Sequence, residues 1–152
     1  MNKYIVTTTI QEPTEATIKF SKKKDWTLVV VGDKKTPASE YKKINCIYLT
    51  PKEQEKINKE LSDEIGWNSI QRRNMGFLFA YKEGADVVAS VDDDNIPYKD
   101  WGKDLYIGQE IDINTYHSSN GIFDPLSVTE HDDLWHRGYP IDLLLSKNKI
   151  KK

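Results

Sequence analysis

The chain has 152 residues, of which 38% are hydrophobic, and its 22 basic and 24 acidic side chains give a net charge of −2. These values indicate a single globular domain and exclude a strongly basic surface that would attract nucleic acid. The single cysteine, Cys46, excludes a disulfide framework, and no apolar run approaches the ~20 residues of a membrane span. Because the N-terminal "MNKYIVTTTI" is too short and polar for a signal peptide, we expect a cytoplasmic protein.

Four short runs rich in β-branched residues predict strands, at residues 4–10, 26–31, 45–49 and 86–91. A polar helix is predicted between the first two, over residues 14–24, with Ala16 and Phe20 facing inward.

A sharper helix signal begins at Thr50. Thr50 and Glu53 have the spacing of a capping box, and Pro51 occupies the first helical position, where its missing N–H costs nothing. Apolar residues then follow at intervals of four: Ile57, Leu61 and Ile65.

A third helix is predicted over residues 68–83, and it ends at Gly84, a suitable C′ glycine. Its helical projection predicts a buried stripe of Ile70, Phe77 and Tyr81. Asn74 projects onto this stripe, Arg73 borders it and Arg72 points away. Arginine and asparagine near a helix N-terminus suit phosphate and ribose oxygens. The alternative is a structural amide beside solvated arginines.

Strands that alternate with helices predict an α/β fold with a mostly parallel sheet and helices on both faces. Such a sheet binds its ligands beyond the carboxyl ends of its strands. Polar residues stand at three of these ends: residues 7–9, Gly32-Asp33 and residues 92–94. We therefore expect these three segments to converge at one edge, although loops after strands are commonly polar.

The regular pattern fades after Asn95. The remaining sequence is rich in Gly, Pro, Asp and aromatic residues, and we expect loops and a few short strands packed against the sheet. The prediction is one domain over residues 4–145, followed by a basic tail over residues 146–152.

Three consecutive aspartates follow the fourth predicted strand. In an extended segment Asp92 and Asp94 point the same way and Asp93 points opposite. Two carboxylates so placed can share a divalent cation, and a ligand set of oxygens alone favours Mg²⁺ or Mn²⁺. A hydrated turn is the alternative.

Two other functions of the aspartates are disfavoured. An EF-hand calcium loop is excluded, because Ile96 and Pro97 stand where an oxygen ligand and the glycine belong. An aspartyl phosphotransferase motif of the type Asp-x-Asp-x-Thr is disfavoured, because no threonine follows Asn95 and the aspartates come too late in the chain.

The segment "RRNMGFLFAYKEGADVVASVDDDN" resembles the Arg-Asn-x-Gly … Gly-Ala … Asp-x-Asp block of glycosyltransferases with the GT-A fold. More narrowly, "WTLVVVGDKKTP", "GWNSIQRRNMGFLFAYKEGA", "VDDDNIP" and "RGYPI" resemble the STELLO glycosyltransferase-like family. "VDDDN" and "RGYP" are also similar to the reversibly glycosylated polypeptides, which act as UDP-arabinopyranose mutases. The resemblance spans about residues 4–143, and it implies a compact or shortened GT-A-like domain.

The resemblance also implies site residues. Asp92 and Asp94 match the motif that chelates Mn²⁺ or Mg²⁺ on the diphosphate of a nucleotide sugar. Thr8 and Asp33 match positions that hold the base and ribose, and Arg137 of "RGYP" could meet sugar or phosphate oxygens. The full set of nucleotide-sugar-binding candidates is Thr8, Asp33, Arg72, Arg73, Asn74, Asp93 and Arg137.

Proteins of this fold usually continue for about a hundred further residues, which supply acceptor contacts, a catalytic base and often a late histidine ligand. Candidates for the base here are Asp132 and Asp133, and candidates for the late metal ligand are His131 and His136. His117 is a weaker candidate. An acidic turn and surface histidines are the alternatives.

These features together predict a metal-dependent glycosyltransferase that uses a nucleotide-diphosphate sugar, with a UDP-sugar expected first. One alternative is a non-catalytic nucleotide-sugar-binding or assembly module that has lost the acceptor half, and another is a sugar-nucleotide mutase. A nucleotidyltransferase is disfavoured, because no glycine-rich phosphate loop follows the first strand. The acceptor is unknown, and homo-oligomerisation is left open.

Overall fold

The structure is a computed structural model that describes residues 1–118, 121–131 and 133–146. The chain divides into two compact units, Met1–Lys103 and Asp104–Lys152, and each is described by itself. A single domain over residues 4–145 therefore stays a prediction.

The first unit is built on a four-stranded parallel sheet in the order β3-β2-β1-β4. Its strands are β1 (Lys3–Thr9), β2 (Thr27–Gly32), β3 (Ile47–Leu49) and β4 (Val87–Ser90). Val6 of β1 pairs with Val29 on one side and Ser90 on the other. The predicted strands and their parallel arrangement are confirmed.

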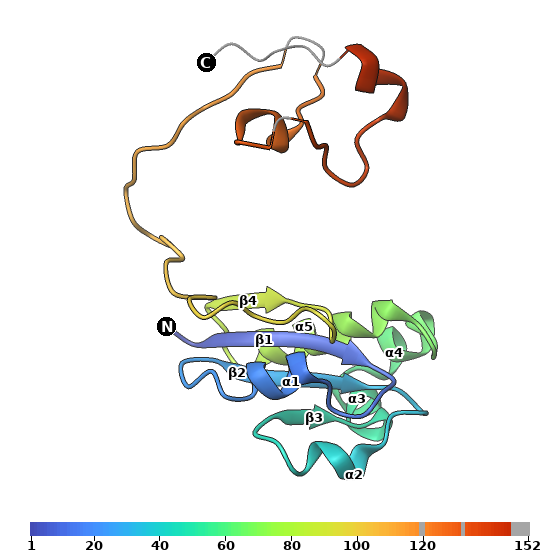
Figure 1. Ribbon diagram of the computed structural model, residues 1–152. Coiled ribbons are helices and arrows are strands. Elements are labelled where there is room, and N and C mark those ends of the chain that lie inside the picture. The colour runs from blue at the N-terminus through green and yellow to red at the C-terminus, as the bar shows by residue number, and fades with distance from the viewer. Residues whose placement is uncertain (119–120, 132, 147–152) are drawn as a thin grey trace. The chain divides into compact units, whose positions relative to one another are not determined.

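Helices cover both faces of this sheet (Figure 1), which confirms the predicted α/β class. Ile5 and Val30 face a core closed by Phe20 and Tyr41, whereas the alternate residues of the strands face a core closed by α5. The helical segments are α1 (Glu15–Phe20), α2 (Ala38–Tyr41), α3 (Pro51–Ile57), α4 (Lys59–Ile65), the 3₁₀ helix η1 (Ile70–Arg72) and α5 (Arg73–Lys82).

Trp101 completes the first core from beyond the sheet. Its ring centroid lies 5.0 Å from that of Phe20 in an edge-to-face contact and 5.0 Å from that of Trp26. The backbone of Gly102 lies so close to the Trp26 indole that an added Cβ would come within 2.9 Å of it. The chain after β4 is therefore anchored at this point.

The capping box at Thr50 is confirmed in both directions, but the helix that it starts is interrupted. Asn58 is extended, with φ −163° and ψ 104°, and its side chain accepts a hydrogen bond from the Leu61 N–H to start α4. Asparagine is a favoured N-cap residue, and its side chain starts a second helix here. The apolar residues at intervals of four, which predict one helix, therefore lie on two short helices.

The predicted buried stripe of the third helix is wrong at Ile70 and Tyr81, whereas Phe77 is partly buried and packs against the core. Ile70 is 63% exposed, Tyr81 is 79% exposed and Asn74 is exposed. The fully buried positions are instead Arg72, Met75, Gly76 and Ala80. Hydrophobicity alone indicates the wrong face, because a glycine and an alanine, not large side chains, let α5 approach the sheet closely. Gly84, with φ +75°, ends the helical segment as predicted.

The described residues of the second unit form two 3₁₀ helices, η2 (Pro125–Val128) and η3 (Ile141–Ser146). No strand occurs in its described residues, so the predicted short strands are wrong there. Asp124 starts η2 by accepting a hydrogen bond from the Leu126 N–H. Turn-forming residues and local caps therefore decide the backbone where hydrophobic periodicity is weak.

No helix in the described part of the chain is long and apolar enough to cross a bilayer.

Replacing Gly76 with alanine should destabilise the protein. The added Cβ would lie 2.5 Å from Val6 Cγ1 and 2.7 Å from Val31 Cγ2, both in the core. Overpacking of about 1–3 kcal/mol should exceed the gain of about 1 kcal/mol in helix propensity. Urea unfolding measures the difference, with the exposed Tyr81→Ala as a control near wild-type stability. A Gly76→Ala protein as stable as wild type would contradict the packing.

Stability should fall as the pH rises from about 9 to about 12. Burial raises the pKa of Tyr41 from 10.0 to about 12 and the pKa of Cys46 from 9.0 to about 11. The unfolded chain releases these protons first, so the free energy of unfolding decreases across this window. Urea unfolding at several alkaline pH values gives the free energy of unfolding as a function of pH. This free energy should fall less steeply with pH in Tyr41→Phe and in Cys46→Ala than in the wild type. Slopes equal to that of the wild type would show that neither group is responsible.

Candidate functional site

A cavity of about 380 Å³ lies at the carboxyl edge of the sheet in the first unit. Its lining comes from residues 8–11, Asp33, residues 68–70, Arg73 and residues 92–94. The expected convergence of the three polar strand ends is therefore confirmed.

The order of the strands explains why the cavity forms there. The chain passes from β1 to β2 and β3 on one side, and then returns to place β4 on the other side of β1. The connections after β1 and β4 thus run to opposite sides, which opens a crevice at their carboxyl ends. Thr8 and Asp92 stand at the two strand ends that flank this crevice.

Asp92 has protein partners on both carboxylate oxygens. Arg73 Nη2 donates to Asp92 Oδ1 at 2.5 Å, and Asn95 Nδ2 donates to Oδ2 at 3.4 Å. Arg73 also donates from Nη1 to Ser90 Oγ at 3.2 Å. The Arg73 side chain is 17% exposed and that of Asp92 is 52% exposed, so this ion pair lies at the cavity wall and reaches solvent.

Asp93 is held by threonines on the other side of the aspartate turn from Arg73. Its Oδ2 accepts a hydrogen bond from Thr9 Oγ1 at 2.5 Å, and its carbonyl accepts one from Thr14 Oγ1. Asp93 and Asp94 form a turn, so the alternation of an extended strand fails here and all three aspartates line the cavity. The expected opposite orientation of Asp93 is wrong for that reason.

Asp94 differs from both neighbours, because it makes no hydrogen bond or ion pair with any described residue. Its carboxylate is exposed at the cavity. The three like charges are thus relieved by a guanidinium, a hydroxyl and solvent, in that order along the chain.

Asp33 lines the cavity although it is only 3% exposed. Its Oδ1 accepts a hydrogen bond from the Lys34 N–H at 2.6 Å, and its Oδ2 accepts one from the Asn68 N–H at 2.8 Å. Asn68 has φ +55°, a left-handed conformation that asparagine tolerates better than most residues. Thr8, the other predicted base or ribose contact, donates to the Val31 carbonyl at 3.1 Å.

Arg72 does not line the cavity. Its guanidinium is fully buried and donates to Gln54 Oε1, to Ser62 and to the Gly66 carbonyl. It also lies 3.9 Å from the centroid of the Trp67 ring. Burial lowers the pKa of this guanidinium. Asn74 is exposed and also lies outside the cavity lining.

Sequence reasoning missed several cavity residues on the loop before α5. Asn68 and Ser69 line the cavity, and Ser69 also caps η1 by accepting from the Gln71 N–H. A serine directly before a helical run is an N-cap signal, and it could have marked this loop.

The other predicted residues belong to the second unit. His131, Asp133 and Arg137 are exposed there, and His131 Nε2 lies 3.7 Å from Glu130. Asp132 falls outside the described residues, and His117 is exposed.

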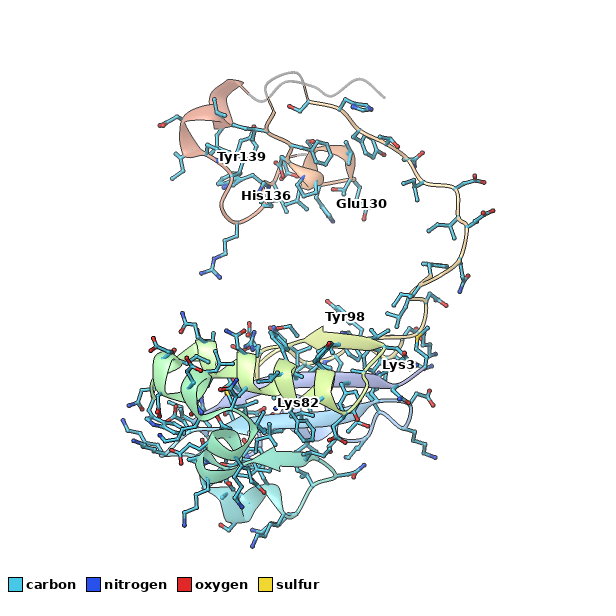
Figure 2. The ribbon with its side chains drawn as sticks, turned by 180° about the vertical axis from the view of Figure 1, so that it is seen from behind. Lys3, Lys82, Tyr98, Glu130, His136 and Tyr139 are labelled. Atoms are coloured by element: carbon cyan, nitrogen blue, oxygen red, sulfur yellow. The ribbon has the colours of Figure 1, made fainter. Side chains whose placement is uncertain are left out.

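His136 makes the more definite contact in this unit. Its Nδ1 lies 3.0 Å from Oδ1 of Asp124, and its ring packs edge-on against Tyr139 (Figure 2).

Four aspartates line the cavity, and Asp92 and Asp94 are the pair that the sequence predicts for a cation. No group of three His, Cys, Asp or Glu side chains suited to a metal occurs among the described residues. Mg²⁺ and Mn²⁺ commonly take one or two carboxylates and complete their shell with water and substrate phosphates. The partner-free carboxylate of Asp94 fits such a cation.

No protein-family model matches the sequence. The chain is 24% identical over 150 residues to "Probable glycosyltransferase STELLO2" of Arabidopsis thaliana, which covers 92% of this chain and 20% of that protein. It is 28% identical over 91 residues to "Probable glycosyltransferase STELLO1" of the same plant, covering 60% of this chain and 12% of that protein. The chain thus spans a fifth or less of these curated relatives, and the similarity supports a glycosyltransferase-like family in general terms.

The two adjacent arginines should respond differently to the same substitution. Arg72→Met leaves the acceptors on Gln54 and Ser62 buried and unpaired, which should cost at least about 2–3 kcal/mol. Arg73→Met removes a partly exposed ion pair and should cost about 1 kcal/mol or less. Urea unfolding of both variants gives the comparison. Equal losses would contradict the assignment of Arg72 to the framework and Arg73 to the cavity.

Proposed function

We propose that this chain binds a nucleotide-diphosphate sugar, with UDP as the first candidate nucleotide, together with Mn²⁺ or Mg²⁺, and transfers the sugar to an acceptor. The observation that carries the proposal is the meeting of Asp92, Asp94 and Arg73 at one cavity, where the strand order reverses. The similarity to two probable glycosyltransferases supports it. We assign the first unit to a GT-A-like architecture on the same grounds.

The proposal divides the binding work among residues of the cavity. Asp92 and Asp94 hold the cation, and the Arg73 guanidinium offers a planar pair of donors to diphosphate oxygens. Asp33 already accepts two backbone N–H groups, and the remaining lone pairs of its carboxylate can accept from ribose hydroxyls. Thr8 lies beside it at the end of β1.

In the proposed reaction, the acceptor oxygen bonds to the anomeric carbon, the bond from that carbon to the diphosphate oxygen breaks, and the acceptor proton passes to a base. When bound, the metal supplies Lewis-acid stabilisation of the departing diphosphate. Arg73 adds a second positive charge, and Thr9 keeps the aspartate turn in place through Asp93. Asp132 and Asp133 remain the proposed bases, with His131 and Arg137 as proposed metal and sugar ligands.

A non-catalytic nucleotide-sugar-binding module is the second candidate. It is favoured by one observation: Asp33, Asp92 and Asp93 all accept hydrogen bonds from the protein, so Asp94 is the one partner-free carboxylate among the described cavity residues. If Asp94 holds the cation, none of these carboxylates is left to serve as a base. A mutase is the third candidate, because it would use the same binding residues without an acceptor.

Thermal shift with UDP, GDP and CDP, each with Mn²⁺, Mg²⁺ or a chelator, tests the binding step. We expect stabilisation by one nucleotide diphosphate that depends on the metal and is lost in Asp94→Asn. Because Asp94 has no described partner, this variant should fold as stably as wild type. Asp63→Asn, at an exposed position of α4 outside the cavity where the side chain pairs with Lys59, is the control and should keep the effect. No shift with any nucleotide would refute the proposal.

Incubation with labelled UDP-sugars then separates the candidates. Release of UDP with transfer of label to an acceptor indicates a transferase. A change in the sugar without release of UDP indicates a mutase, and binding without either change indicates a module.

A further inference from the structure

The contact between Arg73 and Asp92 has a consequence for how ligands enter the cavity. Without ligand, Asp92 Oδ1 is taken by Arg73 Nη2 at 2.5 Å, whereas Asp94 has no described partner. A cation that uses both carboxylates therefore finds one of them already neutralised by a protein cation.

The guanidinium of Arg73 is itself incompletely paired. Its two terminal nitrogens contact Asp92 and Ser90, but its Nε is buried without a hydrogen-bond partner among the described residues. A guanidinium that gains a bidentate anionic acceptor satisfies more of its five donors. The cavity that Arg73 lines is where such an acceptor would sit.

A divalent cation and Arg73 would repel each other if both stayed on Asp92. The cation alone would displace the guanidinium and leave it without a counter-ion. A diphosphate that arrives with the cation supplies that counter-ion, so each ligand removes the obstacle to the other.

We propose that Arg73 is an exchangeable counter-ion that makes the binding of the divalent cation and of the nucleotide diphosphate mutually dependent. This inference rests on the proposed function, and it adds a regulation of the same site. Arg73 pairs with Asp92 in the empty site and with the diphosphate in the loaded site. The site then rejects free metal as well as metal-free nucleotide.

The test measures two affinities in the wild type and in Arg73→Met. Mn²⁺ affinity is measured by electron paramagnetic resonance with and without UDP, and UDP affinity by calorimetry with and without Mn²⁺. In the wild type each ligand should tighten the other by the same factor, about 5–150-fold, as linkage requires. Mn²⁺ alone should bind to Arg73→Met at least about 5-fold more tightly than it binds to the wild type. UDP in the presence of Mn²⁺ should bind to this variant about 10-fold more weakly than to the wild type.

A control variant separates the exchange from a general change in charge. Lys34→Met removes the same charge from the side chain next to Asp33, but this lysine contacts the Trp67 ring instead of Asp92. It should leave the coupling factor at its wild-type value.

Three outcomes would overturn the inference alone, and a fourth would also refute the proposed function. If Arg73→Met weakens UDP binding but leaves Mn²⁺ binding unchanged, Arg73 is only an anion contact. If Lys34→Met strengthens Mn²⁺ binding as much as Arg73→Met does, the effect comes only from the change in net charge. If the wild type binds Mn²⁺ and UDP independently, the inference fails while the proposed function stands. If neither UDP, GDP nor CDP binds with or without Mn²⁺, both are refuted.

Discussion

The buried pair of Gln54 and Arg72 joins two strands and three helical segments of the first unit at one point. Gln54 Nε2 donates to the carbonyls of Gly32 and Leu49, at the ends of β2 and β3, while its Oε1 accepts from Arg72. Arg72 in turn donates to Ser62 of α4. Two side chains therefore fix α3, α4 and the start of α5 against the carboxyl edge of the sheet. Because Arg72 is committed to the interior, Arg73, about 100° further around the helix, is turned to the cavity.

The same edge explains how three adjacent carboxylates are tolerated. Asp92 has a cation, Asp93 has a hydroxyl and Asp94 has solvent, so no two of them compete for one partner. The guanidinium belongs to α5, the hydroxyl belongs to the end of β1, and the third partner is solvent. The turn is therefore held by two elements of the protein, while the carboxylate of Asp94 is left available. Such an arrangement suits a ligand that brings its own positive charge.

The sequence predicted what local rules decide and missed what packing decides. Strand ends, the capping box at Thr50 and the convergence of polar residues at one edge all follow from short-range patterns. The face of α5 does not, because Gly76 contributes no hydrophobic signal although it packs so close to Val6 and Val31 of the sheet that a Cβ would not fit. The burial of Arg72 is equally invisible, since its acceptors lie 10 and 18 residues away in sequence. Asn74 was misplaced by the same error, whereas Arg73 and the aspartates do line the cavity, Arg73 from the start of α5 and the aspartates because they follow the end of β4.

The anchoring of Trp101 has a practical consequence for engineering. Residues 95–100 form a connection that is held at one end by the aspartate turn and at the other by the indole between Phe20 and Trp26. Within it, Tyr98 is 87% exposed, so its side chain contributes little to the core. A connection with fixed ends accepts varied residues at exposed positions such as Tyr98 at little cost to folding. Tyr98 is therefore a natural place to introduce varied residues, because the connection follows directly on the aspartates of the cavity while the sheet and its helices stay unchanged.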